Sequence, residues 1–275
     1  MNRNERIRIA ERTLQQLAQG NYQAPSGRTV GLLHGMKLAL ARTSLHESPR
    51  TPTTRTKKQT RIDVTKESTV AAILRLAPET PGHLAALNFA SAKNPGGGFL
   101  GGAQAQEESL ARTSGLYPCL LTQMEFYRRH RENRCLLYQD LAIFSPSVPF
   151  FVNDDGQLLE SPALTSVITC PAPNAGAVTN NQPENLSLVQ ETLNRRANFV
   201  LQLAANQQVD SLILGAWGCG VFRNDPTQVA AAFGSLLLGE GPFRSSFTRI
   251  TFAIYDTSAG GAVYRAFAHH FQPTG

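Results

Sequence analysis

Apolar and polar positions repeat with two periods along this chain, and together they predict alternating helices and strands. Apolar residues spaced about 3.6 apart indicate helices, and short apolar runs indicate buried strands. Helices are predicted at 4–19, 66–77, 107–134, 184–208, 226–238 and 261–271, the third with a break near Gly115 and Pro118. Strands are predicted at 54–65, 84–90, 166–170, 211–214 and 250–255, with a strand pair in 141–152 divided by the bend Pro146–Pro149. Residues 28–65 otherwise suggest irregular structure. The alternation indicates an α/β sandwich with a largely parallel or mixed sheet.

The run from Asn94 to Glu108 is the most informative stretch of the chain. Five glycines, Gly96, Gly97, Gly98, Gly101 and Gly102, follow the predicted strand 84–90 and precede two adjacent acids at the start of a helix. Glycines let the main chain pass close to a ligand and offer N–H groups to phosphate or sugar oxygens. A carboxyl group held beside such a loop can exchange a proton with the ligand.

A second glycine-rich loop, residues 215–220, follows the predicted strand 211–214. Asn224, Asp225 and Pro226 then form a plausible N-cap and first helical position. Ligands of open α/β sheets bind at the carboxyl ends of the strands, so the two loops predict a cleft there that suits a diphosphate. The spacing of the second loop is neither that of a dinucleotide fingerprint nor that of a P-loop. The alternative is that both loops are only tight turns.

Glu107 and Glu108 are neighbours, so on a helix their side chains diverge by about 100°. One can therefore face the cleft while the other hydrogen-bonds a different part of the ligand. The alternative is a pair of acids placed at a helix start because the helix dipole favours them there.

The length and composition of the chain fit one large domain, alone or with an extension. No apolar run approaches the ~20 residues needed to cross a bilayer, and the first residues do not form a signal peptide, so a soluble cytoplasmic protein is expected. Cys119, Cys135, Cys170 and Cys219 form no CxxC pair and are expected to be reduced and mostly buried. The pair His269–His270 has no metal-site spacing, and a surface pair is the expected alternative to a metal site.

The formal net charge of +6 suits a polyanionic partner. Basic residues gather in two clusters. One contains Arg50, Arg55, Lys57, Lys58 and Arg61, and the other contains Arg128, Arg129, His130, Arg131 and Arg134. Neither has the interleaved aromatic residues that stack on single-stranded nucleic acid, so two solvated faces are the favoured interpretation.

The string Gly96-Gly97-Gly98, seven further residues and then Gln106-Glu107-Glu108 resembles the signature of poly(ADP-ribose) glycohydrolases. That signature is a triple glycine followed, after a short spacer, by Gln-Glu-Glu. Three other segments resemble the bacterial-type branch of this family, namely Asn88–Pro95, Pro171–Asn174 and Gly218–Phe222. The resemblance covers about 84–271, and more weakly the segment before it. It implies an N-terminal accessory segment, 1–80, packed on a macrodomain-like catalytic domain, 81–275, with a three-layer α/β/α fold.

The resemblance also implies roles for individual residues. Glu108 would be the catalytic acid and base. Glu107 would be a second catalytic residue that holds ribose hydroxyls and helps set the geometry, and Gln106 would support the loop. Gly96, Gly97 and Gly98 would approach the terminal ribose and the diphosphate, and Asn94 would bond that ribose. Gly218, Cys219, Gly220 and Val221 would wrap the diphosphate, and Phe222 would pack on the ligand. Asn174 and Tyr255 are weaker candidates, chosen for their positions at strand ends.

The implied reaction is hydrolysis of the ribose–ribose O-glycosidic bond of poly(ADP-ribose), with ADP-ribose as the product and no metal or cofactor. The implied partners are this polymer or ADP-ribosylated proteins, as in the response to DNA damage, with no requirement for a membrane or nucleic acid. Three alternatives remain open: a hydrolase of single ADP-ribose groups, a non-catalytic ADP-ribose reader, and a nucleic-acid-binding protein. The sequence leaves exo- and endo-cleavage open.

Overall fold

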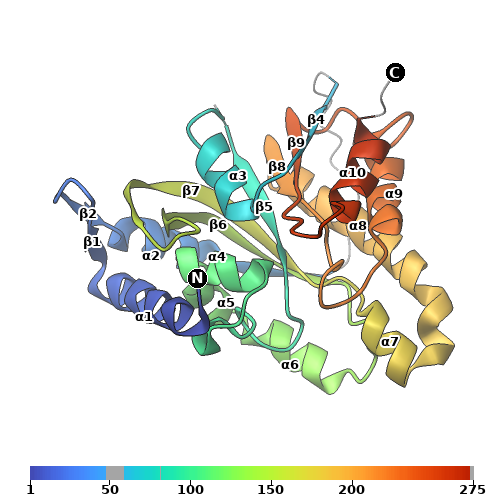
Figure 1. Ribbon diagram of the computed structural model, residues 1–275, viewed down its shortest axis with the longest axis horizontal. Helices are drawn as coiled ribbons and strands as arrows, with labels where there is room; N and C mark the ends of the chain where they lie inside the picture. Colours follow the sequence, from blue (N-terminus) through green and yellow to red (C-terminus); the bar gives the residue numbers. More distant parts are fainter. Residues whose placement is uncertain (48–58, 81, 273–275) are drawn as a thin grey trace.

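A seven-stranded mixed sheet forms the centre of the computed structural model, which describes residues 1–47, 59–80 and 82–272 (Figure 1). Its strand order is β3-β6-β7-β5-β8-β9-β4. The strands are β3 (Ser44–Glu47), β4 (Arg61–Thr65), β5 (Leu84–Phe89), β6 (Leu141–Val152), β7 (Leu158–Cys170), β8 (Ser211–Leu214) and β9 (Arg249–Ala253). The five strands from β7 to β4 pair in parallel, whereas β6 runs antiparallel to both β3 and β7. β1 (Asn21–Gln23) and β2 (Thr29–Gly31) form a separate antiparallel pair.

Helices cover both faces of this sheet. They are α1 (Arg3–Gln19), α2 (Leu33–Arg42), α3 (Thr69–Leu76), α4 (Gln106–Thr113), α5 (Leu116–Leu121), α6 (Met124–Glu132), α7 (Ala175–Asn181), α8 (Val189–Asn206), α9 (Pro226–Leu237) and α10 (Ala262–Phe271). Two short 3₁₀ turns, η1 (Phe99–Gly101) and η2 (Pro183–Leu188), precede α4 and α8. In Figure 1, α8, α9 and α10 lie on one side of the sheet, and α1, α2, α4 and α5 lie on the other.

The alternation of side chains along β5 explains the three layers. Ala85 and Leu87 belong to the core shared with α8, α9 and α10, whereas Leu84 and Ala86 belong to the core shared with α2, α3, α5 and α6. Successive residues of a strand point to opposite faces, so a central strand that is apolar throughout requires cover on both sides. The predicted α/β/α architecture is therefore confirmed.

Helix boundaries follow local signals. Asn2 and Glu5 form a capping box at the start of α1, and Gly20 ends that helix in the left-handed conformation. Asp225 caps α9 as predicted, accepting hydrogen bonds from the main chain of Thr227 and Gln228, with Pro226 in the first turn. The long predicted helix 107–134 is instead three helices. Its second break follows Leu121 rather than Pro118, because Pro118 lies in the first turn of α5, where its missing N–H is not needed.

Other predictions need correction. The expected strand pair in 141–152 is one strand, β6, whose register against β7 shifts between Ser145 and Val148. The bend at Pro146–Pro149 is thus a β-bulge within one continuous strand. β7 begins at Leu158, well before the predicted start at 166. Residues 33–42, expected to be irregular, form α2. In the predicted helix 184–208, the first residues form η2, and α8 begins at Val189.

The N-terminal part of the chain also builds the sheet. β3 and β4 come from the first 80 residues and form the two edges of the central sheet. The domain boundary at residue 80 stays a prediction. The strand predicted at 54–65 is β4 from Arg61 onward, and residues 54–58 lie outside the described residues. Within the described parts of the chain, no helix combines the length and apolar character of a membrane span.

Candidate active site

The loops that carry the predicted site residues leave neighbouring strands at the same edge of the sheet. In spatial order β7, β5, β8 and β9 end at Cys170, Phe89, Leu214 and Ala253, and all four run in the same direction. The second loop begins directly against the ends of the two neighbouring strands. A side chain at Gly215 would lie 2.9 Å from the Phe89 ring and 2.7 Å from the Ala253 carbonyl oxygen. Both glycine-rich loops therefore lie where a ligand cleft of an α/β sheet is expected.

Glu107 is held beneath the first glycine loop, and its side chain is only 3 % exposed. The Ser91 main-chain N–H donates to its Oε2 at 2.6 Å, and the Asn88 amide nitrogen donates to its Oε1 at 3.3 Å. Burial raises the pKa of Glu107 to about 8, although the hydrogen bonds from Ser91 and Asn88 act to lower it, and the neighbouring Glu108 carboxylate raises it slightly more. At neutral pH Glu107 therefore keeps its proton.

Glu108 lies on the loop side of α4 and is partly exposed. Its Oε1 accepts a hydrogen bond from the Gly98 main-chain N–H at 3.0 Å. This bond ties the carboxyl group to the end of the glycine triplet. Glu107 is thus the buried member of the acid pair, and Glu108 is the member that solvent or a ligand can reach. The divergence predicted from their adjacent positions on a helix is what the structure contains.

Gly97 separates the two acids. It adopts the left-handed conformation with φ +59°, and a Cβ there would overlap Glu108 Oε1 and approach Glu107 Oε2 to 3.3 Å. Gly96 is also left-handed, at φ +68°, and its main-chain N–H is directed at the Glu107 carboxyl group. Non-glycine residues rarely adopt this conformation, so the backbone can pass this close to both carboxyls only with glycine. The closeness of the two carboxyl groups therefore requires glycine here, a requirement that a tight turn alone would not impose.

The Gln106 side chain joins the start of α4 to the end of β5, and the loop-supporting role expected for it stays a prediction. Its side-chain oxygen accepts from the Phe89 N–H at 2.8 Å, and its side-chain nitrogen donates to the Leu87 carbonyl at 2.8 Å. The amide thus continues the hydrogen-bonding pattern of β5 and fixes the start of α4 against the strand. Asn94 is exposed on the loop surface, and its carbonyl accepts from the Gly97 N–H at 3.0 Å.

The second loop is anchored to the loop after β7. Gly218 is left-handed at φ +74°, and a Cβ there would lie 2.6 Å from Ala172 Cβ. The buried Asn224 amide donates to the Pro173 carbonyl at 2.9 Å and to the Gly218 carbonyl at 3.2 Å. Trp217 is fully buried, and its ring nitrogen donates to the Cys170 carbonyl at 2.9 Å. These bonds hold the turn in shape and leave its outer residues facing solvent.

The remaining candidates of the second loop differ in exposure. Val221 is 80 % exposed, Gly220 is exposed, and Phe222 is half-buried. Burial raises the pKa of the Cys219 thiol to about 12, so a reactive thiolate is not formed there. These positions fit the backbone and packing roles predicted for them, and those roles stay predictions.

Asn174 and Tyr255 lie at the same edge, in different settings. The Asn174 side-chain oxygen accepts from the Ala177 N–H at 3.0 Å and caps α7, so it is already engaged in a structural bond. Tyr255 follows β9 and is 73 % exposed. The rings of Tyr138 and Phe222 lie 6.0 Å apart, so Tyr138 lies beside the second loop. Nothing in the hydropathy pattern singled out Tyr138. Asn88, by contrast, was detectable as a polar residue inside an otherwise apolar strand.

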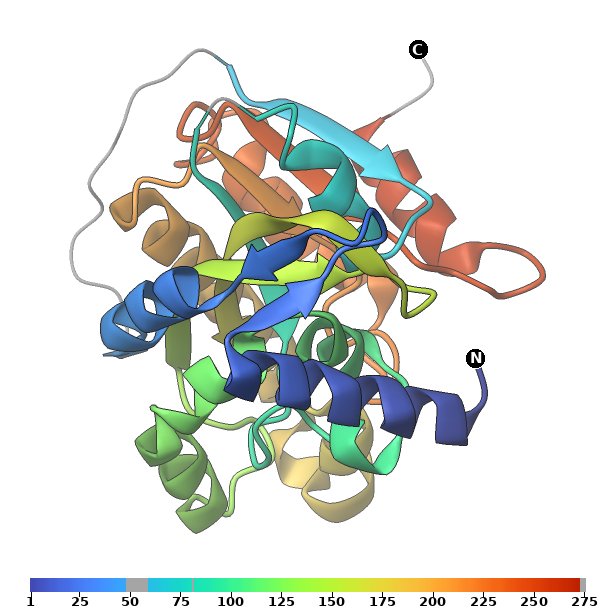
Figure 2. The same ribbon diagram turned by 90° about the vertical axis from the view of Figure 1, so that its left-hand side faces the viewer.

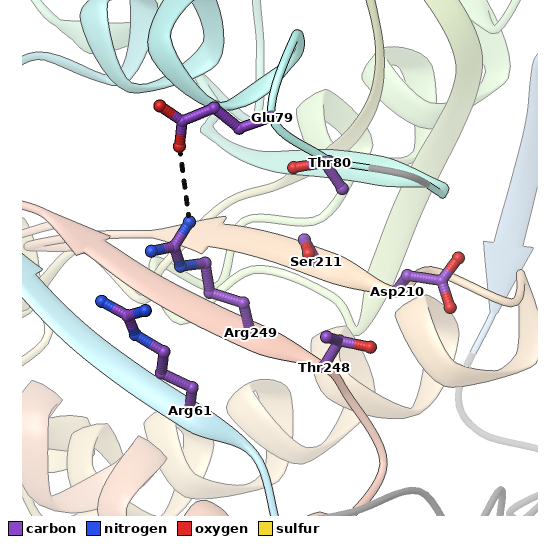
Figure 3. A pocket seen from close by; sticks show the side chains of 7 residues that line it. All are labelled: Arg61, Glu79, Thr80, Asp210, Ser211, Thr248 and Arg249. Carbon is purple, nitrogen blue, oxygen red and sulfur yellow. Dashed lines mark ion pairs between the residues drawn. The ribbon is translucent and has the colours of Figure 1, made fainter.

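A cavity elsewhere in the molecule lies away from the acid pair and the glycine loops. One of about 330 Å³ lies at the amino edge of the sheet, and its lining residues are Arg61, Glu79, Thr80, Asp210, Ser211, Thr248 and Arg249 (Figure 3). Arg249 and Glu79 approach each other to 3.9 Å across it. Arg61, Ser211 and Arg249 begin β4, β8 and β9, at the opposite ends of the strands from the glycine loops. The carboxyl edge is the candidate site because the acid pair and the exposed loop backbone meet there.

The structure describes the second basic cluster in full and the first only in part. In the second cluster Arg128 pairs with Glu125 and Glu132, and Arg129 pairs with Glu47, so much of its charge is balanced locally. Arg131 donates to the Lys93 carbonyl at 2.8 Å, beside the first glycine loop. Of the first cluster only Arg61 is described, since Arg50, Arg55, Lys57 and Lys58 lie outside the described residues. Over the described ranges, no group of His, Cys, Asp and Glu side chains is arranged to hold a metal ion.

Comparison with known proteins agrees with this fold. A family model described as microbial-type PARG, catalytic domain, matches residues 10–153. The solved structure of poly(ADP-ribose) glycohydrolase (PARG) from Thermomonospora curvata is 42 % identical, with a TM-score of 0.91 over 98 % of this chain and 100 % of that chain. A structure of the Thermomonospora protein bound to the inhibitor ADP-HPD is 43 % identical, with a TM-score of 0.90 and the same coverage.

The Deinococcus radiodurans PARG in complex with ADP-ribose is 44 % identical, with a TM-score of 0.80 over 86 % of this chain and 97 % of that chain. A comparison with curated proteins gave no match. The fold, with two glycine-rich loops at the carboxyl edge of its sheet, defines a macrodomain-like protein. Within that class, this chain belongs to the microbial-type poly(ADP-ribose) glycohydrolase family.

Proposed function

We propose that this protein hydrolyses the ribose–ribose O-glycosidic bonds of poly(ADP-ribose) and releases ADP-ribose, with Glu108 as the general acid and base. One observation carries the proposal: Gly97 lies between the two carboxyl groups so closely that a methyl group there would overlap Glu108. The Gly96 and Gly98 N–H groups thus face the two acids, and the accessible acid Glu108 lies beside them at the carboxyl edge. Family membership supports the substrate class, as does the ADP-ribose complex of the Deinococcus protein.

The protonated Glu108 carboxyl gives its proton to the departing 2′ oxygen as the glycosidic bond breaks. Positive charge then builds on the anomeric carbon, and the Glu108 carboxylate removes a proton from the water that attacks it. General acid–base help of this kind contributes roughly 10²–10⁴-fold to the rate. The substrate's own diphosphate, bent beneath the anomeric carbon, stabilises the cation.

Glu107 has a different part in this proposal. Because burial raises its pKa to about 8, Glu107 is itself uncharged at neutral pH. A neutral carboxyl can both donate and accept, which suits hydrogen bonds to ribose hydroxyls. We propose that Asn94 and the Gly96–Gly98 backbone hold the terminal ribose. Gly218, Cys219, Gly220 and Val221 wrap the diphosphate, and Phe222 packs on the ligand, with Asn174 and Tyr255 at its rim.

Two broader assignments complete the proposal. Residues 1–80 form an accessory segment that completes the sheet of the catalytic domain 81–275. The protein works in the cytoplasm, which the absence of disulfides among its four cysteines supports.

The test is incubation of the purified protein with poly(ADP-ribose) and, separately, with a mono-ADP-ribosylated protein, with products resolved by chromatography. We expect ADP-ribose to appear from the polymer much faster than from the single modification. Release from the modified protein alone would instead assign a mono-ADP-ribosyl hydrolase. Binding of ADP-ribose without release from either substrate would assign a reader and contradict the proposal. Product lengths at early times separate exo- from endo-cleavage.

A further inference from the structure

The first helix lies against the turn that carries the glycine triplet into α4. In Figure 2, α1 runs across the front of the molecule below the β1–β2 pair. Two of its arginines reach the turn. Arg3 Nε donates to the Gly101 carbonyl at 2.9 Å, and Arg6 Nε donates to the Gly102 carbonyl at 2.8 Å. Both bonds are charge-assisted, which makes them stronger than bonds between neutral groups.

Close packing also joins α1 to this turn. Gly102 is left-handed at φ +73°, and a Cβ there would lie 2.6 Å from the Arg3 carbonyl oxygen. The buried side chains of Ala10, Phe99 and Ala111 form a small apolar cluster between α1, η1 and α4. The Phe99 ring also packs on Tyr117 at 4.8 Å between ring centroids. At Gly102 the helix backbone and the loop backbone are therefore in direct contact, with no room for a side chain between them.

Hydrogen bonds continue from this contact to the proposed catalytic acid. The Gly98 carbonyl accepts from the main-chain N–H groups of Gly101, at 3.0 Å, and Ala103, at 3.2 Å. The Gly98 N–H in turn donates to Glu108 Oε1 at 3.0 Å. A displacement of residues 101–103 would thus move the donor that orients the Glu108 carboxyl group.

We propose that Arg3 and Arg6 are positioning residues, which hold the glycine loop so that Gly98 and Glu108 keep their geometry. This inference rests on the proposed function, and it gives the N-terminal helix a purpose in catalysis. Neither arginine needs to touch the substrate. Small misplacements of a catalytic group reduce rates strongly, by as much as ~10²-fold for about 1 Å.

The experiment compares kcat and KM on poly(ADP-ribose) for the wild type, Arg3→Ala, Arg6→Ala and the double variant, in the full chain. We expect kcat to fall by about 10-fold in Arg6→Ala and by about 100-fold in the double variant, within the range that misplacement produces. KM should change by less than the rate does, because neither arginine contacts the substrate in this proposal. Arg6→Lys keeps a cationic donor at this position and should recover part of the lost kcat.

Arg8→Ala is the matched control. Arg8 lies on the same helix and is exposed, and its side chain makes no hydrogen bond to any described residue, so kcat should stay at the wild-type value. Gly102→Ala disrupts the contact between the loop and α1 from the loop side, and it should lower kcat without removing an arginine. Thermal unfolding midpoints accompany each assay. Every variant is assayed well below its midpoint, so that a loss of folded protein is not counted as a loss of rate.

An active wild type whose Arg3→Ala/Arg6→Ala and Gly102→Ala variants keep wild-type kcat would overturn the positioning role and leave the proposed function intact. So would a kcat loss equally large in Arg8→Ala. A wild type that does not cleave the polymer would instead contradict the proposed function itself.

Discussion

Gly97 is the residue on which the geometry of the two acids depends. A methyl group at this position would overlap Glu108 Oε1 and lie 2.9 Å from its Cδ, and the left-handed φ of +59° is strained for any other residue. A substitution must therefore displace either the loop or the carboxyl group.

We predict that Gly97→Ala lowers kcat on poly(ADP-ribose) by at least about 100-fold, the order expected when a catalytic group moves by about 1 Å. The measurement is steady-state release of ADP-ribose. Gly27→Ala is a fitting control, since Gly27 is also left-handed but has open space around it and lies in the β1–β2 turn. Near-wild-type turnover in Gly97→Ala would contradict the proposed geometry.

Glu107 couples the site to stability through its raised pKa. The folded protein keeps the Glu107 proton up to about pH 8, whereas the unfolded chain loses it near the ordinary glutamate pKa of 4.5. The stability that protonation contributes is therefore complete below about pH 4.5 and is lost as the pH rises toward 8.

We predict that the free energy of unfolding of the wild type, relative to Glu107→Gln, falls between about pH 5 and about pH 8. The amide does not titrate, so the difference isolates this group. The slope cannot exceed about 1.4 kcal/mol per pH unit for one proton. Urea unfolding at several pH values measures it. A difference that is constant or that rises with pH would show that Glu107 is ionised in the folded protein.

Among the elements, α8 fixes the loops around the candidate site through one buried side chain. Arg196 is fully buried and donates to Asp140 Oδ1 at 3.0 Å and to the carbonyls of Pro171 and Leu137 at 2.8 and 2.9 Å. It thus links the helix to the loop after β7 and to the segment before β6. Arg195 contacts the same carboxylate at 2.6 Å, but its side chain is 46 % exposed.

We predict that Arg196→Met lowers the free energy of unfolding by about 3 kcal/mol or more, because buried carbonyls lose their donors and Asp140 loses its buried partner. Arg195→Ala should cost less than about 1 kcal/mol, as exposed ion pairs do. Chemical denaturation of both variants makes the comparison. Equal, small losses would mean that solvent satisfies the groups that Arg196 now satisfies.

The elements also show where sequence patterns succeed and where they fail. β5, β8, α9 and both glycine loops were predictable, because strong apolar runs, caps and glycines mark them. α2 was missed because Gly35 interrupts its apolar pattern and lowers its helix propensity. β6 was divided at its prolines, since only pairing with β7 reveals that a bulge accommodates them. The contacts of Asn88 with Glu107 and of Tyr138 with Phe222 join segments that are distant in the chain, which one sequence does not reveal.

At the scale of the whole molecule, topology and charge act together. The parallel order of β7, β5, β8 and β9 collects four loops at one edge, although their residues span from Phe89 to Tyr255 along the chain. A net charge of +6 then favours an anionic ligand over the whole surface. The polymer carries many more phosphates than its product, so long-range attraction should favour the polymer.

We predict that KM for poly(ADP-ribose) rises more steeply with salt, from about 50 to about 200 mM, than Kd for ADP-ribose does, because more counterions are displaced from the polymer. Kinetics and calorimetry at matched ionic strengths provide the two slopes. Equal slopes would confine recognition to one terminal unit and exclude a contribution from the wider surface.

The most direct test of the account is the isosteric variant Glu108→Gln. Its amide can still occupy the place beside the Gly98 N–H, but it can neither give nor take the catalytic proton. We predict that release of ADP-ribose from the polymer falls by about 10²–10⁴-fold, the range of general acid–base catalysis, while calorimetry shows ADP-ribose binding within a few-fold of the wild type. Turnover close to that of the wild type would show that another group carries the proton and would contradict the central claim.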